Sequence, residues 1–251
     1  MSLAIVTGAS RGLGFEVVKA LIEQNIEVIG LSRSTNEKVE NLLQNSHGLY
    51  SHESIDLLNM EKLESLIMDL CRRAAARKPK KLYVINNAGT VEPIERLGFL
   101  NNHAIEQALR LNLLAPLVIN NTILRELRDE SIEIIMVNVT SGAAERPIHG
   151  WGIYGATKAA INMHTEVAGL EQEHGNSRYK IIAFGPGIMD TEMQATIRSA
   201  GKAAFADLYQ FQQFKTTGAL RHPSEVAEAL ADLILHKPLV NGMQYDVNEL
   251  I

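Results

Sequence analysis

Short apolar runs alternate with longer segments of helical periodicity along the chain. Strands that alternate with helices predict a parallel sheet, because each connection must cross from one end of the sheet back to the other. Several of the apolar runs hold almost no polar residue, which is typical of strands buried on both faces. We expect strands at 3–7, 27–32, 49–56, 81–87, 133–139, 179–185 and 242–247, and helices at 12–25, 35–46, 59–77, 103–128, 152–174 and 223–236.

The length of the chain favours a single folding unit. It has 251 residues, without an internal repeat or a linker rich in proline, glycine or serine, and α/β chains of this length commonly form one domain. We predict one doubly wound α/β domain over residues 1–251, a seven-stranded parallel sheet with helices on both faces. Residues 188–220 depart from the alternation and carry several aromatic side chains. This segment is either a lid over a substrate or a surface helical excursion, and we favour the lid.

Charge and cysteine content narrow the possible partners. The net charge is −5, so nothing favours a nucleic acid or an anionic membrane surface. Cys71 is the single cysteine, so neither an intrachain disulfide nor a cysteine-rich zinc site can form, and we expect no metal. The N-terminal residues lack a signal-peptide pattern, and no apolar stretch reaches membrane-spanning length. We therefore expect a cytoplasmic protein without a membrane partner.

A glycine-rich turn follows the first expected strand. The sequence TGASRGLG places Gly8, Gly12 and Gly14 immediately before a helix-length segment. Glycines let the backbone approach a phosphate closely, and a helix N-terminus attracts its negative charge. A plain turn is the alternative, since the spacing is G-x-x-x-G-x-G rather than G-x-G-x-x-G. The position directly after the first strand favours a dinucleotide site.

The end of the second expected strand indicates which dinucleotide. Sites for NAD place an acid there to hold the ribose 2′-hydroxyl, but this strand ends GLSRS, with Ser32 and Arg33. Arg11 lies inside the glycine turn. Two guanidinium groups suit a 2′-phosphate, with which they form charge-assisted hydrogen bonds. Unless both arginines are merely solvated surface residues, the sequence predicts NADPH or NADP+ as the cofactor.

The third and fourth expected strands add polar residues at the same edge of the sheet. Asp56 follows the third strand, and Asn87 and Gly89 follow the fourth in the sequence NNAG. Asn87 is expected to brace the backbone, and Gly89 to let the cofactor pass closely. Asp56 has an alternative role as the cap of the helix expected at 59–77.

A tyrosine and a lysine are the strongest candidates for the chemistry. Tyr154 and Lys158 are four residues apart in GWGIYGATKAA, so they share one helix face. A nearby ammonium group can lower the pKa of a phenol toward the working pH of a proton donor. Ser141, after the fifth expected strand, can polarise a carbonyl oxygen. Asn112 lies in the middle of a predicted helix, so we expect either a backbone kink with a bound water or an exposed position.

In order and spacing, TGASRGLG, NNAG, Asn112, Ser141 and YGATK resemble the short-chain dehydrogenase/reductase family over nearly the whole chain. The resemblance implies a Rossmann-type fold, with Tyr154 as the acid that protonates a carbonyl oxygen, Ser141 orienting that oxygen and Lys158 binding the nicotinamide ribose. It also implies that Asn112 holds a water of a proton relay and that long helices pair into a homodimer. The cofactor residues predicted in all are Gly8, Ser10, Arg11, Gly12, Leu13, Gly14, Ser32, Arg33, Asp56, Leu57, Asn87, Ala88, Gly89, Tyr154, Lys158, Pro186, Gly187, Ile188 and Thr191.

Within the family, GWGIYGATKAA and PGIMDTEMQ are most similar to the sepiapterin and benzil reductases. That similarity implies reduction of a small-molecule carbonyl such as a diketone or a pterin side-chain ketone. A sugar-alcohol or hydroxysteroid dehydrogenase and a non-catalytic NADPH-binding regulator are the alternatives. Asp246 resembles an acid that anchors a pterin, unless it is a strand-end acid or a subunit contact. Substrate contacts are expected from Ser141, Trp151, Tyr154, Met189, Met193 and Asp246.

Overall fold

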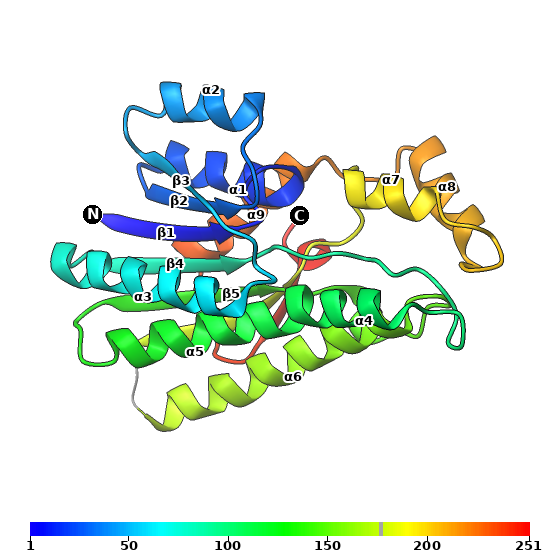
Figure 1. Ribbon diagram of the computed structural model, residues 1–251. Coiled ribbons are helices and arrows are strands. Elements are labelled where there is room, and N and C mark those ends of the chain that lie inside the picture. Colours follow the sequence, from blue (N-terminus) through cyan, green and yellow to red (C-terminus); the bar gives the residue numbers. More distant parts are fainter. Residues whose placement is uncertain (176–177) are drawn as a thin grey trace.

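The computed structural model describes residues 1–175 and 178–251, which form one parallel sheet with helices around it (Figure 1). The strands are arranged in the order β3-β2-β1-β4-β5-β6-β7. The chain starts in the middle of the sheet, builds outward to β3, returns beside β1 and then builds outward the other way. The predicted doubly wound, seven-stranded sheet is thereby confirmed. Its strands are β1 (Ser2–Thr7), β2 (Glu27–Ser32), β3 (Tyr50–Ser54), β4 (Lys81–Asn86), β5 (Glu133–Val139), β6 (Tyr179–Gly185) and β7 (Gln244–Asp246).

The central strands are buried on both faces because their residues are almost all apolar. Ile5 of β1 lies between Ile29 of β2 and Val84 of β4, and all three are essentially inaccessible to solvent. Successive residues of a strand point to opposite faces. Ile5 therefore belongs to one apolar core and Val6 to the core on the other side of the sheet.

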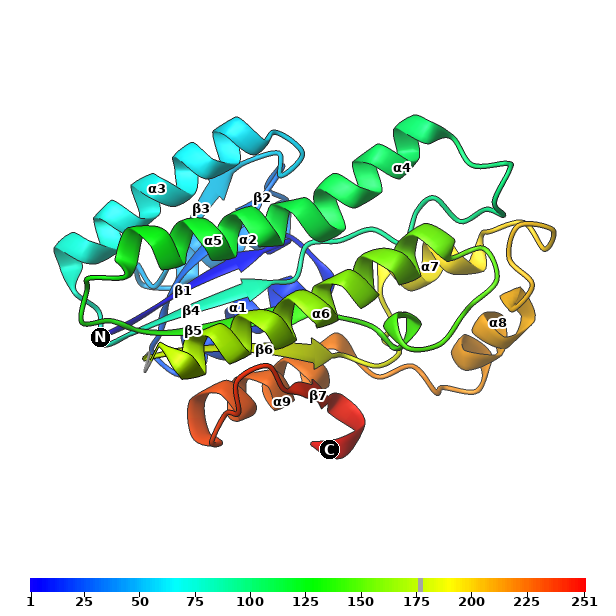
Figure 2. The same ribbon diagram turned by 90° about the horizontal axis from the view of Figure 1, so that it is seen from below.

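Helices cover both faces of this sheet (Figures 1 and 2). One face carries α1 (Gly12–Glu23), α2 (Glu37–Asn45) and α9 (Pro223–His236). The opposite face carries α3 (Met60–Arg77), α5 (Ala115–Leu127) and α6 (Gly152–His174). Each group of helices completes the apolar core on its own side of the sheet, so the strand ends remain as the place for a site.

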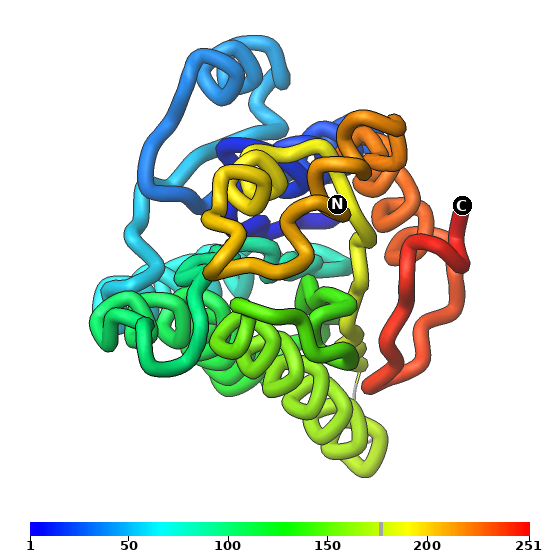
Figure 3. Tube along the Cα trace, turned by 90° about the vertical axis from the view of Figure 1, so that its right-hand side faces the viewer, coloured from blue at the N-terminus to red at the C-terminus, as the bar shows by residue number. Residues whose placement is uncertain are grey.

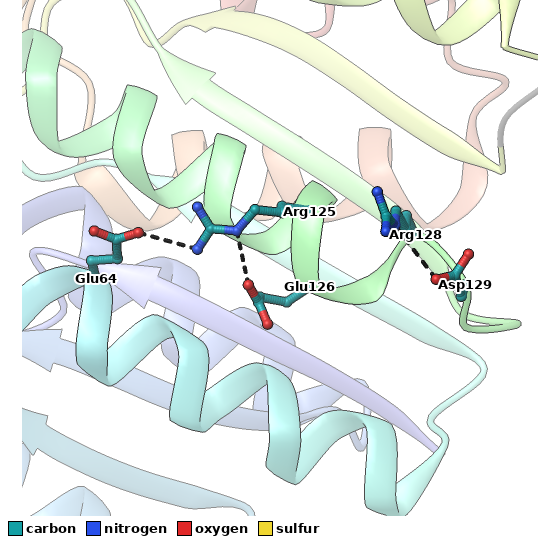
Figure 4. Close-up of polar contacts among 5 residues, drawn as sticks. All are labelled: Glu64, Arg125, Glu126, Arg128 and Asp129. Atoms are coloured by element: carbon teal, nitrogen blue, oxygen red, sulfur yellow. Dashed lines mark hydrogen bonds and ion pairs between the residues drawn. The ribbon is translucent and has the colours of Figure 1, made fainter.

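Polar contacts join α3 and α5 above their shared apolar core (Figure 4). Arg125 of α5 donates to Glu64 of α3 over 3.1 Å and to Glu126 over 2.8 Å. Arg128 pairs with Asp129 nearby at 3.4 Å. These side chains are largely solvated, so each pair contributes less than about 1 kcal/mol. The apolar contacts beneath them hold the two helices together.

The helix predicted at 103–128 is present over residues 102–127, but its middle is not α-helical. The chain forms α4 (Asn102–Leu109), a π-helical turn at Arg110–Leu114 and then α5. The cause lies in Asn112, which is buried and bonds through its side chain to the backbone of Thr90. Asparagine is a poor residue for a helix interior because its amide competes for backbone hydrogen bonds, and π-helical turns often occur at functional sites.

Two strands are three residues shorter than predicted. The strand expected at 49–56 ends at Ser54 and the one at 242–247 covers only Gln244–Asp246. In β7 the ladder ends where Asp246 lies opposite Gly185, because the next residues form a 3-10 turn. The remaining predicted strands and helices agree with the structure to within two residues at each end.

The segment 188–220 contains two short helices, α7 (Glu192–Arg198) and α8 (Leu208–Thr216). They lie at the carboxyl ends of the strands, and Figure 3 views the molecule from that end, with this segment in yellow and orange at the front. Hydrogen bonds between the backbones of Asp190 and Arg221 and of Ile188 and Arg221 tie the two ends of the segment together. It is thus a folded excursion over the same edge of the sheet as the polar residues.

Within residues 1–175 and 178–251, none of the helices combines the length and the apolar character that crossing a bilayer requires. The same part of the chain places no three His, Cys, Asp or Glu side chains together in a way that would hold a metal ion.

Candidate active site

The glycine turn has the shape that a pyrophosphate requires. Gly8 and Gly12 adopt positive φ angles of 69° and 55°, which glycine accepts readily. A Cβ on Gly14 would lie 2.3 Å from the Gly8 carbonyl oxygen, so the turn closes this tightly only with glycine. The helix that follows has Arg11 at its N-cap position, and no side chain caps it. Its first backbone N–H groups are therefore available to a negatively charged ligand, and the turn fits a dinucleotide.

Asn87 braces the turn against the neighbouring strand, as its sequence position predicts. Its Nδ2 donates to the Thr7 carbonyl oxygen over 3.0 Å. In return, Thr7 Oγ1 accepts hydrogen bonds from the backbones of Asn87 and Ala88, each 3.0 Å long. These hydrogen bonds join the carboxyl ends of β1 and β4, which is where the strand order reverses. Open α/β sheets bind their ligands at this position.

The end of β2 carries a buried serine and an exposed arginine. Ser32 is buried, Arg33 reaches solvent, and no acid stands between them and α2 until Glu37. Arg11 is also exposed and forms an ion pair with Glu192 at the start of α7. The structure thus ties the glycine turn to the excursion 188–220, which the sequence did not indicate.

Asp56 does not cap the helix that follows it. Its carboxylate accepts the backbone N–H of Leu58 over 3.0 Å, whereas Asn59 caps α3 by accepting from Lys62 over 3.1 Å. The capping alternative is therefore wrong. Asp56 stays exposed at the carboxyl edge of the sheet beside the buried Leu57.

Tyr154 and Ser141 meet because small residues let their two segments approach. Tyr154 is in the first turn of α6, and Ser141 caps the 3-10 turn Gly142–Ala144 after β5. A Cβ on Gly155 would lie 2.9 Å from the Ala143 carbonyl oxygen, so the small residue is needed for this contact. Burial raises the pKa of Tyr154, and the hydrogen bond with Ser141 partly offsets that rise. The protein alone therefore keeps Tyr154 as a phenol, and the lowered pKa expected from the sequence is not found.

Lys158 lies one helical turn beyond the tyrosine. Its Nζ donates to the Val139 carbonyl oxygen at the end of β5 over 2.7 Å and lies 5.9 Å from the centre of the Tyr154 ring. Burial lowers the pKa of Lys158 to about 8. The ammonium form, which predominates below that pH, places one positive charge next to the phenol.

Asn112 is more deeply buried than Tyr154 or Lys158. Its Oδ1 accepts the Thr90 N–H, and its Nδ2 donates to the Thr90 carbonyl oxygen, both over 2.8 Å. A third contact runs to Thr157 Oγ1 at 3.3 Å. Of the two alternatives from the sequence, the exposed position is wrong and the local distortion of the helix is confirmed. A Cβ on Gly89 would lie 3.3 Å from Asn112 and 3.8 Å from Lys158, so Gly89 borders both side chains.

An aromatic cluster packs around Tyr154. The Trp151 ring lies 5.3 Å from the Tyr154 ring, 5.2 Å from Phe205 and 5.3 Å from Phe211. Phe205 and Phe211 come from the excursion 188–220, which therefore packs directly over the tyrosine. Met193, near the start of α7, is partly exposed.

The segment after β6 passes beside the glycine turn. Pro186 is buried, Gly187 has a φ of 66°, and Ile188 pairs with the backbone of Arg221. Thr191 caps α7, and its methyl group lies 3.6 Å from where a Cβ of Gly12 would be. The segment after β6 thus reaches across to the glycine turn.

Two of the predicted substrate residues lie at the margin of this group. Met189 packs against the apolar core on the α1 and α9 side of the sheet. Asp246 lies opposite Gly185 in the β6–β7 ladder, and its carboxylate accepts from the backbone N–H and the side chain of Asn248 over 2.8 and 2.6 Å. It is half-buried and stands at the same edge of the sheet as the other residues.

Sequence reasoning missed the partners of three site residues. Thr7 secures Asn87, Thr90 secures Asn112, and Glu192 pairs with Arg11. Thr90 follows the NNAG sequence directly and Thr7 precedes the glycine turn, so their positions beside motifs were a usable signal. Glu192 lies 181 residues from Arg11, and no local pattern marks that pair.

Comparison with known proteins agrees with this geometry. The family model for short chain dehydrogenases matches residues 2–202. The benzil reductase ((S)-benzoin forming) of Bacillus subtilis is 37% identical over 251 residues, covering 100% of both chains. The sepiapterin reductase of Bos taurus is 27% identical, covering 98% of this chain and 94% of its own length. The crystal structure of a short-chain dehydrogenase/reductase from Saccharomyces cerevisiae superposes with a TM-score of 0.85 at 27% identity, covering 99% of this chain and 96% of that one.

The resemblance deduced from the motifs is therefore confirmed. The extent of these matches and the shared sheet leave one assignment: this chain belongs to the short-chain dehydrogenase family of oxidoreductases.

Proposed function

We propose that the protein is an NADPH-dependent reductase of small carbonyl compounds, with Tyr154 as the general acid. One observation carries this proposal. Tyr154 is a buried phenol that is hydrogen-bonded to Ser141 after the carboxyl end of β5 and lies one helical turn from Lys158. A reduction consumes a proton at the carbonyl oxygen, and a phenol that stays protonated is the form that can deliver it.

The reaction divides between cofactor and protein. When bound, reduced nicotinamide would supply the hydride for the carbonyl carbon. The Ser141 hydroxyl donates a hydrogen bond to the carbonyl oxygen and holds it beside Tyr154. Tyr154 gives its proton to that oxygen as negative charge develops there, which yields the alcohol. The Lys158 ammonium, 5.9 Å from the ring, stabilises the tyrosinate that is left.

Asn112 and the glycine turn support these groups without entering the chemistry. Asn112 holds the chain at Thr90 beside Lys158 and offers a place for a water that returns a proton to the site. Gly8, Gly12 and Gly14 would accept the pyrophosphate at the uncapped start of α1.

The preference for NADPH rests on the end of β2. Arg33 occupies the place where an acid would hold the ribose of NAD, and Arg11 lies in the adjacent turn. Both side chains are exposed and can turn to a 2′-phosphate, Arg11 after leaving Glu192.

The substrate is proposed from the relatives and from the wall of the site. Benzil and sepiapterin both carry a ketone beside a flat ring, and the rings of Trp151, Phe205 and Phe211, buried against one another, form an apolar wall next to Tyr154. The segment 188–220 would act as the lid that covers such a substrate, because it contributes Phe205 and Phe211 to that wall.

A homodimer is proposed from one apolar helix face. Met163, Val167 and Leu170 of α6 are 60%, 45% and 58% exposed and are spaced so that they share a face. Leu109 and Leu114, at the junction of α4 and α5, are 39% and 40% exposed. Helices that pair across a two-fold axis would bury such residues. We place this dimer in the cytoplasm, without nucleic-acid or membrane partners.

Initial rates with a panel of carbonyl compounds test the proposal. The purified protein should oxidise NADPH with benzil or sepiapterin, more efficiently than NADH, and Tyr154→Phe should lose the reaction. Bound cofactor without turnover on any carbonyl would refute the assignment as a reductase. Turnover that does not distinguish NADPH from NADH would refute only the cofactor preference.

A further inference from the structure

A chain of hydrogen bonds runs along the surface of the sheet below Arg33. Tyr50 and His52 of β3 and Ser32 of β2 point to the same face, since Gly30 lies opposite His52 and residues two apart in a strand share a face. Tyr50 Oη lies 2.8 Å from His52 Nδ1, His52 Nε2 lies 3.1 Å from Ser32 Oγ, and Ser32 Oγ donates to the Ser34 carbonyl oxygen over 2.8 Å.

The donors in this chain can be assigned one after another. Ser32 has a single hydroxyl proton, and the Ser34 carbonyl oxygen can only accept it. Ser32 Oγ must then accept from His52 Nε2–H, which leaves Nδ1 of the neutral ring to accept from Tyr50. Burial lowers the pKa of His52 and raises the pKa of Tyr50 to about 12, so both stay uncharged at neutral pH. Every bond in the chain therefore points from Tyr50 toward Ser34.

The chain ends in the loop that carries Arg33. Ser32 and Ser34 flank Arg33 directly, and on its other side the loop is fastened to the glycine turn, because Asn36 donates to the Ser10 carbonyl oxygen over 2.7 Å. Arg33 is thus held between two fixed points, although its side chain is exposed.

Gly30 shows how closely the residues fit. A Cβ on Gly30 would lie 2.3 Å from Tyr50 Oη and 2.9 Å from the Cβ of Ala9. The Tyr50 hydroxyl therefore lies in space that a side chain at position 30 would otherwise fill, directly beside the glycine turn.

We propose that His52 is a positioning residue for recognition of the 2′-phosphate: through Ser32 it fixes the 32–34 turn so that Arg33 meets the phosphate group. This inference rests on the proposed preference for NADPH. It assigns a share of the specificity to β3, which carries neither of the two arginines proposed to bind the phosphate. Without the chain, Arg33 would still carry its charge but would have to be ordered by the ligand, at a cost in affinity.

Isothermal titration of NADP+ and NAD+ tests the role by binding rather than by turnover. His52→Ala should raise the Kd for NADP+ about two- to tenfold, the effect of one or two hydrogen bonds, and should leave the Kd for NAD+ within about twofold. Tyr50→Phe removes only the first donor and should shift the same ratio by less. Because Tyr50→Phe keeps the aromatic ring at position 50, its effect on the two Kd values tests the inference even if His52→Ala does not fold. His52→Gln, whose amide can donate to Ser32, should restore most of the affinity, and His103→Ala on the exposed part of α4 is the matched control.

A double-mutant cycle with Arg33→Ala separates positioning from general support. If His52 acts through Arg33, then His52→Ala has no further effect in the Arg33→Ala protein. Equal losses for NADP+ and NAD+, or an undiminished loss without Arg33, would overturn the inference. A wild-type protein that binds both dinucleotides equally would overturn the NADPH preference as well. Normal discrimination in a protein that reduces no carbonyl would overturn only the proposed reaction.

Discussion

The side-chain amide of Asn112 pairs with both backbone groups of Thr90, accepting from its N–H and donating to its carbonyl oxygen over 2.8 Å each. The side-chain amide thus forms the same two hydrogen bonds with Thr90 that a backbone partner in a β-sheet would form. These two hydrogen bonds account for the π-helical turn, because they require the Asn112 side chain to point inward, where it is buried. They also fix the chain directly after Gly89, which borders Lys158.

Asn112→Ala should lower the free energy of unfolding by about 1–3 kcal/mol, since two backbone groups at Thr90 lose their partner. Urea denaturation of the variant measures the change. Asn121→Ala is the matched control, because Asn121 is exposed on α5 and its loss should matter by less than about 0.5 kcal/mol. Equal effects at both positions would contradict the structural role given to Asn112.

Tyr154→Phe should reduce kcat at least a hundredfold while the fold and NADPH binding persist, because only the proton donor is removed; general acid catalysis is typically worth about 10²–10⁴. Steady-state rates and cofactor titration on the same preparation check this. Tyr209→Phe, at a tyrosine that is 72% exposed on α8, should keep full activity. Near-normal turnover in Tyr154→Phe would remove the tyrosine from the mechanism.

The lowered pKa of Lys158 predicts how stability depends on pH. Between its folded pKa of about 8 and the ordinary lysine value of 10.5, the unfolded chain binds a proton that the folded chain does not, so wild-type stability rises with pH across this window. Lys158→Met cannot show this rise. The difference between the two unfolding free energies should therefore move by up to about 3 kcal/mol in favour of the wild type from pH 7 to pH 10.

Urea titrations of both proteins at several pH values measure that difference. Lys202→Met serves as the control, because Lys202 is exposed in the segment between α7 and α8. A difference that stays constant with pH would show that the Lys158 ammonium is not penalised by burial.

Asp246→Ala should separate two kinds of substrate. A carboxylate that binds a pterin through charged hydrogen bonds contributes about 1.5–3 kcal/mol, so kcat/KM for sepiapterin should fall roughly 10- to 150-fold. Benzil has no donor to offer, and its reduction should change only a fewfold. Equal losses would instead reflect the bonds that Asp246 makes to Asn248 at the start of the final turn.

Val167→Glu should dissociate the proposed homodimer, because it places a charge in the middle of the exposed apolar face of α6. Light scattering at micromolar concentration compares the masses of the variant and the wild type. Val240→Glu, at another exposed valine, should leave the mass unchanged. A wild-type monomer would rule the dimer out.

Local patterns were enough to predict the sheet, its order of strands and helices, and the residues Ser141, Tyr154 and Lys158 at its edge. Each of these depends on periodicity or on motif spacing within about twenty residues. A distortion at Asn112 was one of two alternatives from the sequence, but its cause could not be predicted, because the bond from Asn112 to Thr90 crosses 22 positions. The direction of the Tyr154 pKa was missed for a related reason, since the sequence shows the neighbouring lysine but not the aromatic cover that desolvates the phenol.

The excursion 188–220 and the proposed catalytic residues are carried by different elements of the fold. Ser141, Tyr154 and Lys158 are carried by β5 and α6, whereas the excursion leaves after β6 and rejoins the chain at α9, its two ends bonded to each other through Arg221. A segment closed on itself in this way can be lengthened, shortened or exchanged between related enzymes without a change in the strands. Under the proposed lid role, exchanging this segment would change which molecules reach Tyr154 while Ser141, Tyr154 and Lys158 stay on β5 and α6.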